Sequence, residues 1–260
     1  GHILCFLPGL YSCKQALKSV NLNLSEDDDE TETRRRIILM KTRIKSSEKA
    51  DDFYSRLREE YIFNEKVHEG NFKHEFIYFL PIIFSGLSDE KVIDLVVNEF
   101  PEDLKRINKL IYSTSFSESF NIDGLSIVID SGLVKEIGFD SMTSLRTVRE
   151  KQAAKETMFQ RKEMLGRTKK GLYVSVQTTK EIPEFQVPLI NRMDLSDAIL
   201  FLKSIDIDFE NLSKLPEKPD ENNVSYAIEN LKYIRALDQK TAKITEFGRS
   251  LLKFPFVSPY

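Results

Sequence analysis

Residues 122–132, with the sequence Ile-Asp-Gly-Leu-Ser-Ile-Val-Ile-Asp-Ser-Gly, hold an apolar run between two turn signals. A short apolar run bounded by Gly and Asp is typical of a buried strand. Further apolar runs stand at 3–7, 76–83 and 172–176, and a helical pattern lies at 89–99. Strands that alternate with helices favour a parallel sheet with crossover connections. The sequence therefore predicts an α/β fold for this part of the chain.

The last third of the chain has a different pattern, because the strand signals end and helical periodicity takes over. We expect helices over 194–202 and 223–236, a short extended stretch at 243–245, and a last helix capped by Thr245. Helix, helix, short strand and helix in this order are typical of a winged helix. The expected domains are therefore an α/β domain over 1–190 and a small, C-terminally truncated winged-helix domain over 191–260.

Composition limits the classes of function. The 260 residues include 38 Lys and Arg and 41 Asp and Glu, so the net charge is −3. This balance excludes a globally basic nucleic-acid binder but allows a local basic groove. No apolar run is long enough to span a membrane. Two cysteines are too few for a disulfide framework, which favours an intracellular compartment, cytoplasmic or nuclear. Because the chain opens directly in a predicted strand, we expect it to be a piece of a longer protein.

A highly charged stretch over 22–68 interrupts the α/β pattern, and an acidic run at 26–32 stands just before the three arginines 34–36. Two interpretations stay open for it. The basic run contacts RNA, or the stretch is a solvated insertion, helical at best, whose charges compensate one another. Further along, a β-hairpin is expected over 134–150, with its bend near Asp140.

Five segments resemble, in order, the motifs in the second half of a DEAH/RHA-type RNA helicase. They are motif IV at 3–9 (ILCFLPG), motif V at 113–124 (STSFSESFNIDG), the following strand at 128–135 (VIDSGLVK), motif VI at 160–168 (QRKEMLGRT), and the wing with its helix at 244–255. The resemblance spans nearly the whole chain except 22–68. A narrower similarity, to the spindle-E-type germline helicases, rests on 182–188 alone.

This resemblance implies the second RecA-like domain and the winged helix of an ATP-dependent RNA helicase. In that architecture the chain forms one wall of the ATP cleft and part of the RNA track, with ATP and Mg²⁺ bound in the complete two-domain protein. The sequence contains no G-x-x-x-x-G-K-[ST] loop and no Asp-Glu-x-His box. An upstream first RecA-like domain would supply those phosphate and Mg²⁺ contacts, so we expect no ATP hydrolysis by this chain alone. The expected partners are that upstream domain, single-stranded RNA and further proteins, and no membrane.

Motif VI departs from the family pattern Q-R-x-G-R-x-G-R. The resemblance assigns Gln160 and Arg167 to its first and last positions, as catalytic and cofactor-binding residues facing the nucleotide, whereas salt bridging on a helix surface is the alternative. Met164 replaces the middle Arg and cannot donate to phosphate, and Glu163 replaces a Gly and adds negative charge. Because an arginine finger contributes about 10³–10⁵ in rate, these changes predict severely slowed hydrolysis.

Motif V departs from the family pattern Thr-Asn-x-Ala-Glu-[TS]-Ser. Ser115 and Ser117 replace the Asn and the Ala, and the segment is one residue shorter than the pattern. By resemblance, Thr114 contacts an RNA phosphate and Asp123 lies near the nucleotide. A turn cap is the alternative for Thr114.

The predicted hairpin carries cations. The resemblance assigns Lys135, Arg146 and Arg149 to RNA-backbone contacts near a duplex end, and ordinary exposed charges are the alternative. No Cys or carboxylate pattern completes a zinc set with His68 and His74, so we expect them to be structural or surface residues and expect no metal site.

Two hypotheses of different classes follow from these motifs. The chain is the C-terminal half of an ATP-dependent RNA helicase, or it belongs to a degenerate helicase-like protein that keeps the fold as an RNA-binding or protein-binding scaffold without ATP turnover. The departures in motifs V and VI favour the scaffold. The motif residues that survive favour some retained contact with ligands.

Overall fold

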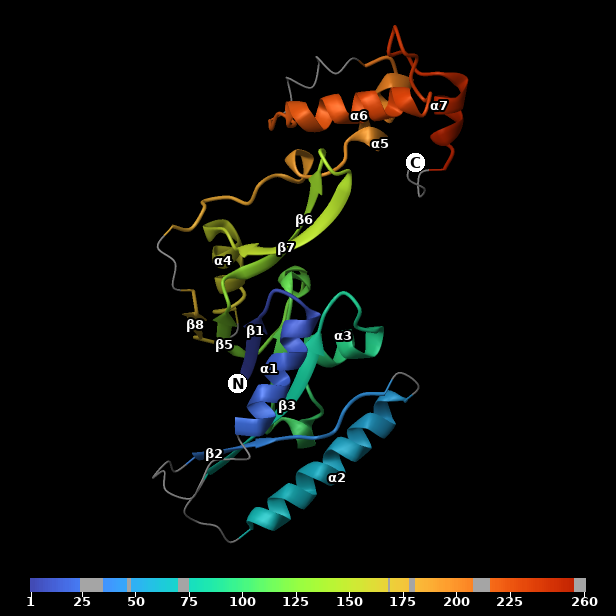
Figure 1. Ribbon diagram of the computed structural model, residues 1–260. Coiled ribbons are helices and arrows are strands. Elements are labelled where there is room, and N and C mark those ends of the chain that lie inside the picture. Colours follow the sequence, from blue (N-terminus) through green and yellow to red (C-terminus); the bar gives the residue numbers. More distant parts are fainter. Residues whose placement is uncertain are drawn as a thin grey trace. The chain divides into compact units, whose positions relative to one another are not determined.

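The computed structural model describes residues 1–23, 35–45, 48–69, 75–167, 169–177, 181–207 and 216–254. The chain divides into two compact units (Figure 1). The first unit holds residues 1–135 and 150–185, and the second holds 136–149 and 186–260. Because each unit has its own hydrophobic core, each is described by itself.

A parallel sheet forms the first unit. Its six strands follow the spatial order β2-β3-β4-β1-β5-β8, and every neighbouring pair is parallel. They span His2–Phe6 (β1), Arg35–Leu39 (β2), Glu75–Phe84 (β3), Ile107–Ser113 (β4), Leu125–Asp130 (β5) and Leu172–Ser175 (β8). The predicted α/β class is confirmed.

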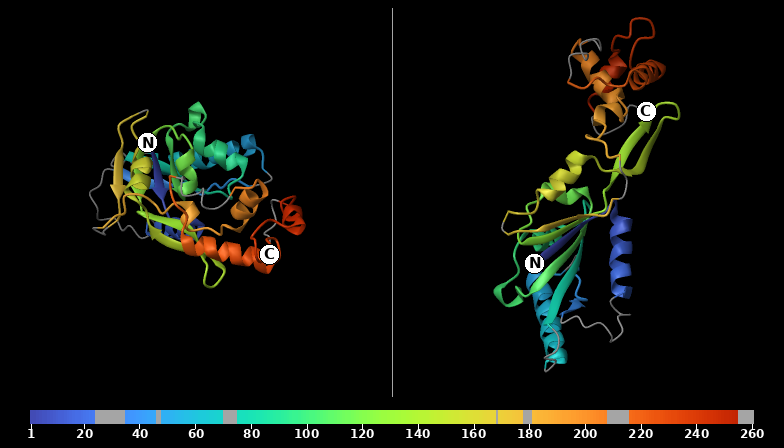
Figure 2. Two further views of the ribbon diagram at one scale, coloured as in Figure 1. Left: turned by 90° about the horizontal axis from the view of Figure 1, so that it is seen from above. Right: turned by 90° about the vertical axis from the view of Figure 1, so that its left-hand side faces the viewer.

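Helices cover both faces of this sheet (Figure 2). They are α1 (Leu10–Asn23), α2 (Ala50–His68), α3 (Glu90–Val97) and α4 (Lys155–Lys162), with 3₁₀ turns η1 (Glu102–Leu104) and η2 (Ser115–Ser119). Alternate side chains of a strand point to opposite faces. Leu4 and Phe6 of β1 therefore join the larger core cluster with residues of α2 and α3, whereas Ile3 and Cys5 join the cluster that contains residues of α1.

The prediction that 22–68 is a solvated insertion, helical at best, is wrong for the residues described there. β2 pairs in parallel with β3 and forms an edge of the sheet. α2 buries Phe53, Leu57 and Tyr61, which recur every four residues and so lie on one helix face. The charged remainder of the helix conceals this apolar stripe in the sequence. The acidic run and Arg34 fall within 24–34, outside the described residues.

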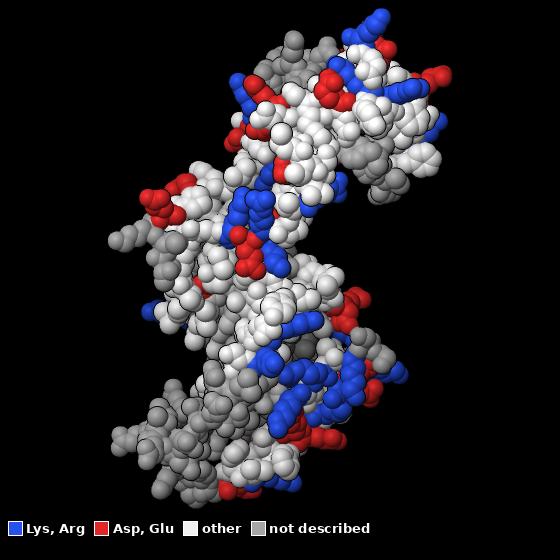
Figure 3. Space-filling model, in the orientation of Figure 1, with Lys and Arg blue, Asp and Glu red and all other residues white. Residues whose placement is uncertain are grey.

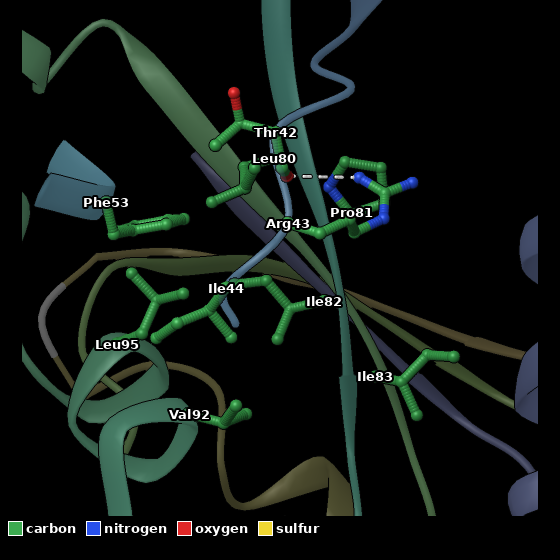
Figure 4. Close-up of a pocket in the computed structure, with 10 residues that line it drawn as sticks. All are labelled: Thr42, Arg43, Ile44, Phe53, Leu80, Pro81, Ile82, Ile83, Val92 and Leu95. Carbon is green, nitrogen blue, oxygen red and sulfur yellow. Dashed lines mark hydrogen bonds between the residues drawn. The ribbon is translucent and has the colours of Figure 1, made fainter. Parts of the chain in front are cut away.

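The edge strand β2 stops where its neighbour lacks a hydrogen-bond donor. The Met40 N–H donates to the Phe79 carbonyl over 2.8 Å, so the backbone of Phe79 faces β2. Pro81, two residues on, faces the same way and has no N–H. The chain then leaves the sheet, and 42–44 line a small cavity of about 90 Å³ (Figure 4). Most of its other lining is apolar and comes from Phe53, Leu80, Ile82, Val92 and Leu95.

The second unit is built around α-helices, which in its described residues are α5 (Ser196–Ser204), α6 (Glu221–Tyr233) and α7 (Glu246–Leu251). A short antiparallel bridge joins Leu237 to Ile244. Thr245 caps α7, because its hydroxyl accepts the Gly248 N–H over 3.0 Å. A Cβ at Gly248 would lie 2.3 Å from the Ala236 carbonyl oxygen, so this turn requires Gly. The predicted order of helix, helix, short strand and helix is confirmed.

Strands β6 (Leu133–Asp140) and β7 (Leu145–Gln152) form the predicted β-hairpin. Its outer part, 136–149, belongs to the second unit, although the sequence assigned the whole hairpin to the α/β domain. Tyr226 of α6 explains this grouping. Its ring lies 5.3 Å from that of Phe139, and its hydroxyl is 2.8 Å from the Ser144 hydroxyl.

Lys109 of β4 is a buried cation with 1% of its surface exposed. Its Nζ donates to the Val96 carbonyl over 3.0 Å and to the Asn98 carbonyl, and it lies 5.1 Å from the centre of the Phe100 ring. Burial lowers the pKa of Lys109 to about 8, although Glu99 opposes this shift. Lys109 thus binds carbonyls at the end of α3 that the helix leaves without partners.

Lys109→Met should change how the stability of the first unit depends on pH. The folded chain releases the Lys109 proton near pH 8 and the unfolded chain near its usual value of 10.5. Between these values the unfolded state binds more protons, so the wild type should gain stability relative to the variant as pH rises, by up to about 1.4 kcal/mol per pH unit. Urea denaturation of both proteins across this window measures the effect. A difference that does not change with pH would contradict it.

Candidate functional site

The carboxyl ends of the parallel strands meet at one edge of the sheet. The register places Phe6, the last residue of β1, opposite Ser113 of β4 and Asp130 of β5. Open parallel sheets bind ligands at this edge. The segments that resemble motifs IV and V both cross it, so the candidate site lies here.

A buried ion network joins the segments at this edge. Arg161 of α4 is 1% exposed and donates from Nη1 to Asp130 and from Nε to Glu118, each over 2.7 Å. Its guanidinium lies 4.6 Å from the centre of the Phe6 ring. Asp130 also accepts the Tyr173 hydroxyl over 2.7 Å and the Gly132 N–H over 2.8 Å. One cation thus ties α4 to η2, β5 and, through Asp130, to β8.

Burial shifts the pKa values of two side chains in this network. Burial raises the pKa of Glu118, and the nearby Arg161 only partly offsets that shift. Burial also raises the pKa of Tyr173, and its hydrogen bond to Asp130 raises it further. With two carboxylates and the Leu133 carbonyl around it, Arg161 directs its donors into the protein rather than toward a ligand.

Arg161 stands in the motif VI segment, but the motif resemblance assigned it no role. A signal was present in Asp130, since a carboxylate at the end of a buried strand needs a partner for its charge. What the sequence does not reveal is which of several nearby cations provides it.

The structure brings Arg167 to the motif V segment. Its guanidinium is exposed and donates to the side-chain oxygen of Asn121, two residues before Asp123, which is also exposed. Gly166 has a φ of 80°, so the turn before Arg167 uses a conformation that favours Gly. Gln160 is exposed on α4. The roles of these residues toward a nucleotide stay predictions.

Met164 faces the core. It is 4% exposed and packs in the larger cluster, whereas the adjacent Glu163 is exposed. The position where the resemblance expects a cleft arginine therefore holds a core side chain in this chain.

Thr114 caps η2, because its hydroxyl accepts the Phe116 N–H over 3.4 Å. Beneath this turn, the rings of Phe84, Phe116 and Phe120 pack with centres 5.0–5.2 Å apart. The structure thus displays the cap that was the alternative for Thr114. The RNA contact stays a prediction, since Thr114 is partly exposed at the strand ends.

The hairpin cations lie in different surroundings. Lys135, in the first unit, covers the motif IV turn so closely that a Cβ at Gly9 would lie 2.6 Å from its Nζ. In the second unit, burial raises the pKa of Asp197 and the charge of Arg146 opposes that shift. There the Thr143 side chain is the main cause of the lowered pKa of Asp140, to which Arg149 contributes least. Arg146 and Arg149 are both exposed.

Other chemistry-bearing residues form no further centre in the described part of the chain. His68 stacks on Phe76 with ring centres 4.2 Å apart, and His74 lies outside the described residues. Burial raises the pKa of Cys5 to about 12 and that of Cys13 to about 11, so both stay thiols at neutral pH. Where the chain is described, no three His, Cys, Asp or Glu residues group to hold a metal ion, and its helices are too short or too polar to cross a membrane.

The chain is similar in sequence to several known proteins. Residues 227–256 match the model of the winged-helix helicase associated domain (HA2). Over 198 residues, 74% of the chain, the sequence is 31% identical to the probable ATP-dependent RNA helicase DHR1 of Saccharomyces cerevisiae. Over the same length it is 30% identical to the ATP-dependent RNA helicase DExH1 of Arabidopsis thaliana. The chain covers 15% and 19% of these two relatives.

A solved structure shares the fold. The crystal structure of the Escherichia coli DEAH/RHA helicase HrpB matches 97% of this chain and 26% of its own length, with a TM-score of 0.66 and 18% identity. The expected RecA-like sheet followed by a winged helix is thereby confirmed.

Replacing Arg161 should destabilise the first unit strongly. Arg161→Met leaves Asp130 and Glu118 buried without their cation, which typically costs about 3–5 kcal/mol. Arg167→Ala is the matched control, and we expect it to change stability by less than about 0.5 kcal/mol because Arg167 is exposed. Chemical denaturation measures both variants. Equal effects would contradict a special role for the buried network.

Met164→Arg, which inserts the arginine of the family pattern, should destabilise the unit by more than about 2 kcal/mol because it buries an unpaired charge. Met164→Leu keeps the volume and should cost less than about 1.5 kcal/mol. Thermal unfolding of both variants tests this. If Met164→Arg retained wild-type stability, its side chain would have a path to solvent and the inward orientation would not be enforced.

Proposed function

Since this chain carries the C-terminal region of the DEAH/RHA-type helicases, we propose that its sheet forms one wall of an ATP cleft and part of an RNA track. The observation that carries the proposal is the Arg161 network, which holds the motif V and motif VI segments together at the carboxyl edge of the strands. Arg167 and Asp123 are left exposed on those two segments.

In the proposed cleft, Arg167 and Gln160 face the phosphates of ATP and Asp123 lies near the nucleotide. An upstream first RecA-like domain supplies the phosphate loop and the Mg²⁺ ligands. Positive charge from Arg167 then stabilises the charge that develops on the transferred phosphoryl group. The partial exposure of Thr114 and the exposure of Lys135 support the RNA track, because phosphate contacts need donors and cations at the surface. The hairpin cations Arg146 and Arg149 extend the set of proposed RNA contacts.

A second candidate function is an RNA-binding or protein-binding scaffold without ATP turnover. The observation that favours it is the pair of changes in motif VI. Met164 is turned into the core, and Glu163 adds an exposed negative charge beside the proposed phosphate contacts. The two candidates share the RNA track and differ in whether ATP is hydrolysed.

RNA-stimulated ATP hydrolysis by the full-length protein separates the candidates. If the chain forms a working cleft wall, Arg167→Ala should lower kcat by at least about 10³, the lower end of the range of about 10³–10⁵ found for arginine fingers. Lys162→Ala removes a neighbouring exposed charge from α4 and should leave kcat within about twofold.

Turnover that survives Arg167→Ala would refute the assignment of Arg167. Absence of wild-type turnover with RNA binding retained would establish the scaffold. Absence of both would refute the proposed function as a whole.

A further inference from the structure

Positive side chains gather on the segment between β2 and α2 (Figure 3). Four of them, called here the basic segment, are exposed: Lys41, Arg43, Lys45 and Lys49. This segment lies within 22–68, the stretch that the motif resemblance does not cover. No role in the proposed ATP cleft or RNA track falls on it.

Side chains of α2 and of the segment itself fix the backbone conformation of the basic segment. The Glu60 carboxylate accepts the backbone N–H groups of Lys41 over 2.5 Å and Thr42 over 2.8 Å. Arg56 donates to both Glu48 oxygens over 2.6 Å. Glu60 thus binds backbone N–H groups of the segment, and Glu48 binds Arg56. Among the described residues, neither carboxylate forms an ion pair with the side chain of Lys41 or Lys45. Asp51 and Asp52, exposed on the first turn of α2, end the positive stretch.

A hydrogen bond joins the basic segment to α3, and the turn before α3 lies close to motif V. Lys91 of α3 donates to the Glu48 carbonyl over 2.5 Å. α3 follows the turn after β3, where a Cβ at Gly86 would lie 3.7 Å from the Phe116 ring. Phe116 belongs to η2, the turn that Thr114 caps. In the sheet, β2 lies two strands from β4, or about 10 Å. This separation is slightly longer than the Debye length of about 8 Å at physiological salt.

We propose that the basic segment binds the phosphate backbone of single-stranded RNA that continues past Thr114. This inference rests on the proposed RNA track and lengthens it across β3 and α3. Lys41, Arg43 and Lys45 stand at every second position, although Arg43 also donates to the Met40 and Thr42 carbonyls of its own segment. Such a row suits a chain with one charge per nucleotide, because phosphates can be neutralised without recognition of the bases. An acidic protein partner is the competing occupant, and the test distinguishes it.

The test compares Lys41→Ala/Lys45→Ala with a matched control, Lys14→Ala/Lys18→Ala, which removes two exposed charges from α1 on the other face of the sheet. Both changes in the basic segment keep the backbone N–H groups that hold it. Binding of fluorescent oligouridylates to the full-length protein is measured over a salt series, with one short oligomer and one three times as long.

The segment variant should bind the long oligomer about fivefold more weakly, with a salt slope reduced by about 1.4, or 0.7 for each lost phosphate contact. The short oligomer and the control variant should bind as the wild type does. If the segment variant bound the long oligomer as the wild type does, while Lys135→Ala lost RNA binding, this inference would be wrong and the proposed RNA track would stand. An acidic protein would then be the partner to test. If the wild type bound neither oligomer, the proposed function itself would fail.

Discussion

A buried guanidinium that pairs with two carboxylates is the constraint on which the candidate site depends. Removing ions from water is tolerated only where each one is paired and hydrogen-bonded. Arg161 satisfies Asp130 and Glu118 at once, and Asp130 takes two further donors from Tyr173 and Gly132. The motif V turn, the end of β5 and α4 therefore share one polar centre. Movement of any one of them would leave a charge buried without its partner.

The same constraint divides the motif VI segment into inward and outward positions. Successive helical residues point about 100° apart, so Gln160 reaches the surface while Arg161 turns inward. Met164 follows Arg161 into the core, and Arg167 returns to the surface beyond Gly166. The chain thus uses one arginine for its own cohesion and keeps another at the surface. This division explains how the fold is retained although the family pattern has lost an arginine.

The charged stretch after α1 supplies one strand and one helix of the first unit. β2 extends the sheet by one strand, and α2 contributes Phe53, Leu57 and Tyr61 to the same core that holds Leu4 and Phe6. Pro81 limits the pairing of β2, so the chain leaves the edge early and passes beside the rest of β3. That exit presents the basic segment on the surface near α3. The missing N–H of Pro81 thus determines where the cations of the basic segment reach the surface.

Local patterns in the sequence were sufficient for the α/β class, the hairpin, the winged-helix order and the Thr245 cap, because each depends on residues a few positions apart. Motif order likewise pointed to the helicase family, whereas the role that it assigns to Arg167 stays a prediction. The partners of Arg161, the inward turn of Met164 and the core role of α2 could not be read in this way. Glu118 and Asp130 lie 43 and 31 residues before Arg161, and the charged exterior of α2 hides its apolar stripe. Burial and charge pairing depend on contacts between residues that are far apart in the sequence, and only the tertiary structure determines those contacts.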